Sequence, residues 1–324
     1  MIDILRGSGL GCEVFGVFMG AILHADDILL LSGSRNGLQK MVDICFRFAS
    51  KLNLSFGTHE DPSKSKSKCV IFTKKKLENV MNITLNGRIL PWVSSFNYLG
   101  SIIQSDNSMS MDIAQKQAIF ISSANSILQE FHFVNPSLLM KLINIYATSF
   151  YGSVTWNLFS KECDRIYKSW NVCVCQVFNV DRKTHKFLVE PISESKHAMT
   201  MLMCRFQQFI ENISNSNKFE VRFLAGLHIT DLSSVTGKNQ NNIAKHLNTQ
   251  REALTPAFIK ANSIYRVPCQ DNIWQVHLTR ELLEVRSEEI SIEGFNAFEI
   301  EELLNFACTS SEINSYNYLC TVNF

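Results

Sequence analysis

The sequence lacks an apolar run long enough to cross a bilayer. Its longest uninterrupted run, residues 14–23, has ten residues, about half of the roughly 20 that a membrane-spanning helix needs. The N-terminus also lacks the order of basic region, apolar region and small-residue cleavage site that marks a signal peptide. We therefore expect a protein that is neither secreted nor embedded in a membrane.

Charge of either sign is scarce. Asp, Glu, Lys and Arg make up 19% of the 324 residues and the formal net charge is +1, which excludes a chain that coats nucleic acid over its whole surface. The 10 cysteines are irregularly spaced, with no pairs at zinc-finger spacing. This usage predicts reduced thiols in a cytoplasmic or nuclear protein. Apolar residues make up 46%, which excludes wholesale disorder.

The hydrophobic pattern changes near residue 105. Before it, short β-type segments alternate with turns, and Asn86-Gly87 is the dipeptide that a two-residue hairpin turn prefers. After it, apolar residues recur at helical spacing, and Asn135-Pro136 has the form of a cap followed by proline at the first helical position. The order predicts an α+β protein, with domains at 1–105, 106–215 and 216–324, the last mostly helical.

Three local patterns refine this outline. Asn36 and Gln39 resemble a capping pair that opens a helix running to about residue 52. A later helical stripe consists of Ile166, Trp170, Val174 and Val177. Residues 236–250 form a polar stretch, after which a tail with an acidic segment at 281–302 is expected to be mostly helical.

Two adjacent carboxylates, Asp26 and Asp27, stand between two apolar runs of strand length. This pattern predicts a tight hairpin with the acids at or near its tip. Carboxylate oxygens suit Mg²⁺ better than imidazole or thiolate does. Two metal ions about 3.5–4 Å apart also need a carboxylate from a neighbouring strand. A solvated turn is the alternative interpretation of the pair.

Two further groups are candidates for contact with nucleic acid. Residues 62–76 carry six lysines and no acid, so they either bind phosphates or form a solvated basic loop. Phe96 and Tyr98, before the turn at Gly100, either stack on bases or contact a primer backbone, or else they belong to the core. Trp156 and Trp170 are expected to be packing residues.

The segment 16–32, which contains His24-Ala25-Asp26-Asp27, strongly resembles the Tyr-Ala-Asp-Asp segment of reverse transcriptases from non-LTR (LINE-type, jockey-like) retrotransposons. The resemblance continues with order and spacing kept to about residue 225. It includes the helix after the hairpin, the lysine-bearing loop, the hairpin that grips the primer, and the helical region after the palm. These correspond to the segments 37–48, 64–69, 85–100 and 150–205.

The resemblance implies a truncated polymerase palm followed by a thumb-like helical region and a helical tail. Asp26 would bind the catalytic Mg²⁺ and Asp27 would assist. A lysine near the phosphates of the incoming dNTP would come from the set Lys64, Lys66 and Lys68, of which Lys64 and Lys66 are the catalytic candidates. His24, Lys68, Phe96, Tyr98 and Gly100 would contact the RNA template and DNA primer.

The sequence departs from the family in two respects. The family's first catalytic aspartate lies well upstream of the hairpin, whereas this chain has 25 residues before Asp26, and His24 replaces the usual aromatic residue. We therefore expect a fragment of an RNA-directed DNA polymerase that is inactive alone. The alternatives are a non-catalytic module that binds nucleic acid or protein, and an unselected relic.

Overall fold

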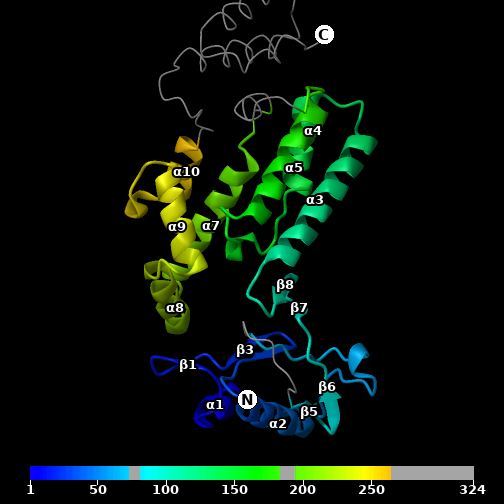
Figure 1. Ribbon diagram of the computed structural model, residues 1–324, viewed down its shortest axis with the longest axis vertical. Helices are drawn as coiled ribbons and strands as arrows, with labels where there is room; N and C mark the ends of the chain where they lie inside the picture. The colour runs from blue at the N-terminus through cyan, green and yellow to red at the C-terminus, as the bar shows by residue number, and fades with distance from the viewer. Residues whose placement is uncertain (73–80, 183–192, 194, 264–324) are drawn as a thin grey trace, which may run out of the picture. The chain divides into compact units, whose positions relative to one another are not determined.

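The computed structural model describes residues 1–72, 81–182, 193 and 195–263 (Figure 1). The chain forms two compact units, Met1–Met111 and Asp112–Phe324. Small antiparallel strand pairs occur in the first unit and helices dominate the second, so the expected mixture of helices and strands is confirmed. The acidic tail and Lys74–Lys76 of the lysine-rich segment lie outside the described residues.

The first unit is built from hairpins around one long helix. It contains α1 (Ile2–Gly7), β1 (Glu13–Val14), β2 (Val17–Phe18), β3 (Ala21–His24), β4 (Asp27–Leu30), α2 (Arg35–Lys51), β5 (Ile83–Leu85), β6 (Arg88–Leu90), β7 (Ser95–Tyr98) and β8 (Ser101–Gln104). Among the described residues these strands form four two-stranded antiparallel sheets, each joining consecutive strands. The hairpins expected at Asp26-Asp27 and Asn86-Gly87 are both confirmed.

The core of the first unit lies along one face of α2. Met41, Val42 and Cys45 are buried at helical spacing. Met41 and Cys45 pack with Leu5 of α1, while Val42 packs with the inward residues of β5 and β6. A single helix therefore anchors both the β3–β4 hairpin and the β5–β6 hairpin.

The cap expected at Asn36 is wrong by two residues. Ser34 is the N-cap of α2, and its hydroxyl accepts a hydrogen bond from the backbone N–H of Gly37 at 3.1 Å. Both residue types are good caps. The helix starts earlier because Ser32 and Ser34 already turn the chain that leaves β4.

The second unit is helical over its described residues. It comprises α3 (Ser110–Glu130), which begins at the boundary, α4 (Pro136–Tyr146), α5 (Lys161–Val177), α7 (Ala198–Ser214), α8 (Phe219–Thr230), α9 (Val235–His246) and α10 (Pro256–Asn262). Asn135 caps α4 as expected, accepting from the N–H of Ser137. Trp156 and Trp170 are fully buried, which confirms them as packing residues. None of the described helices is both long and apolar enough to span a membrane.

Candidate functional site

The β3–β4 hairpin places the two aspartates at its tip. His24 pairs with Asp27, so the turn consists of Ala25 and Asp26, and Asp27 is the first residue of β4. Ala25 has a φ of 51°, a backbone conformation that is unfavourable for a residue with a Cβ. Both carboxylates are exposed. The hairpin therefore presents two adjacent anionic groups to solvent on a tight, conformationally restricted turn.

The base of this hairpin is held by close packing of glycines. Gly20, just before β3, accepts a hydrogen bond from the N–H of Leu31 at 2.8 Å. A Cβ on Gly20 would lie 2.7 Å from the Phe18 ring and 2.9 Å from the Cα of Gly11. Ala21 and Leu30, which pair directly, pack on the α2 core. The buried base thus fixes the hairpin while its tip stays exposed.

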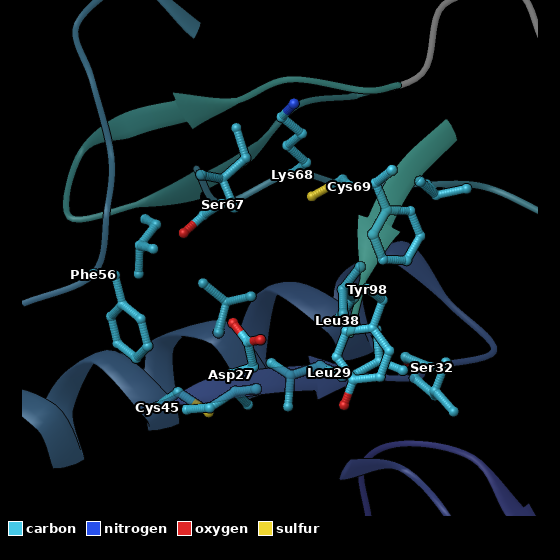
Figure 2. A pocket seen from close by; sticks show the side chains of 18 of the residues that line it. Asp27, Leu29, Ser32, Leu38, Cys45, Phe56, Ser67, Lys68, Cys69 and Tyr98 are labelled. Carbon is cyan, nitrogen blue, oxygen red and sulfur yellow. The ribbon is translucent and has the colours of Figure 1, made fainter. Parts of the chain in front are cut away.

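A cavity of about 1300 Å³ lies beside the hairpin within the first unit. Figure 2 shows the carboxylate of Asp27 projecting into it from β4, with the Ser67–Cys69 segment opposite. Of the site residues expected from the sequence, the cavity brings together Asp26, Asp27, Lys66, Lys68, Phe96 and Tyr98. His24, Lys64 and Gly100 do not line it.

Tyr98 is an aromatic residue of the cavity whose phenol is influenced by the charge of Asp27. Burial, and secondarily the negative charge of Asp27, raises the pKa of the Tyr98 phenol. Its hydroxyl is buried and makes no hydrogen bond within the described residues. Leu99 and Gly100 turn the chain after it, with φ values of 46° and 79°. The β7–β8 hairpin therefore supplies a protonated phenol near the anionic tip of the β3–β4 hairpin.

The lysine-bearing loop is ordered by its backbone. The N–H groups of Lys66 and Ser67 both donate to the carbonyl of Gly57 at 3.0 Å. The buried hydroxyl of Ser65 donates to the carbonyl of Ser67 at 2.9 Å. Lys66 and Lys68 are held on the cavity wall in this way. Lys64 instead lies 3.9 Å from the Asp61 carboxylate as an exposed ion pair.

The described residues do not complete a magnesium site. Asp26 and Asp27 supply carboxylates from one hairpin tip, but the described residues contain no group of three His, Cys, Asp or Glu side chains that could hold a metal ion. A two-metal centre needs a carboxylate from another strand. We therefore derive no chemical step through a metal ion in this chain.

Among the cavity residues that the sequence did not indicate as site residues are Arg35 and Trp92. Arg35, the first residue of α2, lines it and donates to the carbonyl of Asn82. Trp92 also lines it, with a buried indole N–H that has no partner in the described part of the chain. Neither lies in a motif. The Pro91 carbonyl accepts the N–H of Cys69 and so joins this segment to the lysine loop, a contact between distant residues that no local sequence pattern indicates.

The comparisons with known proteins add no relative. No protein-family model, no curated protein and no solved structure gives a significant match to this chain. Any functional assignment therefore depends on the residues and their geometry.

Proposed function

We propose that this chain is a portion of a LINE-type reverse transcriptase, and that the β3–β4 hairpin and the helices after residue 110 derive from its palm and thumb. One observation carries the proposal. His24-Ala25-Asp26-Asp27 forms the tip of a tight hairpin, and the acids line the same cavity as Lys66, Lys68 and Tyr98. Anionic, cationic and aromatic groups gathered in this way suit a metal-bound triphosphate and a nucleic-acid strand.

Under this proposal, the chain alone does not synthesise DNA. Asp26 and Asp27 can contribute two ligands to Mg²⁺, which would supply charge neutralisation at the phosphates of a dNTP. The third carboxylate must come from outside the described residues. What the described residues can do is bind. Lys66 and Lys68 can neutralise phosphates, and Phe96 and Tyr98 can contact bases or sugars.

A second candidate function follows from the same cavity. With two lysines on its wall and no complete metal group in the described chain, the first unit suits a non-catalytic module that binds an RNA–DNA or RNA duplex. This function needs no aspartate from elsewhere. The two candidate functions use the same binding surface. They differ in evolutionary origin and in whether Asp26 is needed.

A primer-extension assay tests the catalytic part of the proposal. The full chain is incubated with an RNA template, a DNA primer, dNTPs and Mg²⁺, beside Asp26→Ala and a matched control, Asp3→Ala, at another exposed aspartate. We expect no extension from any of the three. Template-dependent extension that disappears only in Asp26→Ala would contradict inactivity and reveal a complete site.

Binding of an RNA–DNA duplex at several salt concentrations tests the retained function. We expect affinity to fall with salt, and the double variant Lys66→Gln/Lys68→Gln to reduce the log–log salt slope by about one per lysine removed. Lys40→Gln, an exposed lysine of α2 outside the cavity, is the matched control. Absence of binding at low salt would eliminate both functions.

The origin of the chain is tested separately on DNA. The sequence upstream of the Met1 codon should encode, in frame or interrupted, a strand bearing the family's first catalytic aspartate. If the upstream DNA encodes nothing of this kind, the retrotransposon origin is wrong, whatever the binding assays show.

A further inference from the structure

A second cavity lies within the second unit, between α3 and α5. We call it the α3–α5 groove; its volume is about 350 Å³, near the lower end of the roughly 300–1,000 Å³ typical of small-molecule pockets. Its buried floor consists of Phe120, Ala124 and Cys173, and Val172 lines it half-buried. The groove belongs to the second unit, whereas the Asp26–Asp27 site belongs to the first.

A polar side chain on α3 bridges the two helices beside the groove. The side-chain amide of Gln117 on α3 donates to the hydroxyl of Ser169 at 2.8 Å and to the carbonyl of Arg165 at 3.3 Å. The two helices lie side by side in the second unit (Figure 1). Gln117, Arg165 and Ser169 all line the groove, so this bridge forms part of its wall.

The groove has cations and no acid among its lining residues. Lys168 lines it but is paired with Asp164 at 2.7 Å, a carboxylate that does not line the groove. Arg165 lines it too, and within the described chain its exposed guanidinium has no hydrogen bond or ion pair. A guanidinium offers five N–H donors in a planar fork that matches an anionic group.

From the apolar floor and the unpaired guanidinium we infer that the α3–α5 groove binds a small organic anion with a compact apolar body. The anionic group, a carboxylate, sulfonate or phosphate, is held by Arg165. The apolar body lies against Ala124 and Val172. Lys168 pairs with Asp164, which reduces the repulsion between that carboxylate and the ligand. The groove is too small for a nucleic-acid strand, and the ligand is distinct from the duplex of the proposed function.

Calorimetric titration of the full chain with naphthalene-2-sulfonate tests this site, with the neutral naphthalene-2-sulfonamide as the matched ligand. We expect saturable binding of the sulfonate. Arg165→Gln should weaken it roughly 2- to 5-fold, the value of an exposed ion pair. The sulfonamide should bind wild type and Arg165→Gln alike. Lys161→Gln, on the same helix outside the groove, should leave binding unchanged.

A second variant separates the groove from other apolar surfaces. Val172→Trp fills the hollow and keeps Arg165, so it should abolish binding while the helical circular dichroism is retained. Binding that is unchanged in Arg165→Gln overturns the assignment. Loss of binding in Lys66→Gln/Lys68→Gln would also overturn the assignment, because the sulfonate would then occupy the cavity of the first unit. No saturable binding to wild type also overturns it.

Discussion

The indole N–H of Trp156 donates a hydrogen bond to the carboxylate of Asp112, 2.7 Å away, and both side chains are fully buried. Trp156 precedes α5, and Asp112 lies in the first turn of α3. The bond therefore joins two parts of the second unit that are 44 residues apart in sequence. A hydrogen bond to a carboxylate in a buried environment is stronger than one in water, and losing its donor is costly.

Trp156→Phe should destabilise the protein by about 1–3 kcal/mol, because the buried carboxylate loses a donor while most of the ring packing stays. Urea unfolding followed by far-ultraviolet circular dichroism measures the change. Asp164→Asn, which removes an exposed pair with Lys168, is the control and should cost less than about 1 kcal/mol. Equal losses in the two variants would show that the bond contributes nothing.

Gly20→Ala should destabilise the first unit by about 1–3 kcal/mol, the usual cost of overpacking. The new methyl group would lie 2.7 Å from the Phe18 ring and 2.9 Å from the Gly11 backbone. Gly33→Ala is the matched control, since a Cβ there meets nothing within 4 Å. Thermal unfolding of both variants beside wild type tests this. A Gly20→Ala protein as stable as Gly33→Ala would contradict the close packing at the hairpin base.

Stability should fall as the pH rises from about 9 to 12. Burial raises the pKa of the Cys163 and Cys173 thiols to about 12, from an ordinary value of 9.0. In that window the unfolded chain has lost these protons and the folded chain still binds them. Each thiol then lowers the free energy of unfolding by up to about 1.4 kcal/mol per pH unit. Burial also raises the pKa of Tyr167, which adds to the effect above its ordinary value of 10.0.

Urea midpoints measured between pH 8 and 11 test this dependence. A Cys163→Ala/Cys173→Ala variant should be less stable at pH 8 yet lose less stability on the way to pH 11. The control is Cys12→Ala, at a half-exposed thiol, and it should keep the wild-type slope. Parallel pH profiles for all three proteins would rule out the buried thiols as the cause.

Limited proteolysis should cleave the first unit before the helices of the second. The β-sheets of the first unit are two-stranded wherever the structure describes them, so each of these strands has one edge without a paired strand. Ile22 and Leu23 of β3 are exposed at 47% and 36%, so this hairpin leaves apolar surface in water. Mass spectrometry should find a protected fragment within 110–215. A protected 1–105 fragment with the helices digested first would refute the prediction.

Local sequence patterns predicted those turns and helix caps that are formed by residues close together in the sequence. Asn86-Gly87 formed its turn, with φ values of 54° and 72°, because few other residues tolerate that backbone. Asn135 caps α4 because its side chain reaches an N–H two residues away. The mixed class and the hairpin at Asp26-Asp27 followed from the same kind of periodicity. The assignment to a polymerase family, in contrast, stays a prediction based on resemblance.

The polar stretch 236–250 shows where local patterns fail. Its composition gave no reason to expect burial, yet Asn239 is fully buried in α9. Its amide accepts the N–H of Leu158 at 3.0 Å and donates to the carbonyl of Trp156 at 2.7 Å. A buried amide is tolerated when its partners are in place. Those partners lie about 80 residues away in sequence, so no nearby pattern could reveal them.

The sequence by itself determined the hairpins at Asp26-Asp27 and Asn86-Gly87, the cap at Asn135 and the buried stripe of α5, because each depends on residues within a few positions of one another. Only the tertiary structure decided which candidates share a cavity. It placed Lys66 and Lys68 with the aspartates and left Lys64 beside Asp61. It also brought α3 and α5 together at the α3–α5 groove, where Gln117 bridges the two helices. These outcomes depend on how separate segments pack, which is set by steric fit over the whole unit and not by neighbours along the chain.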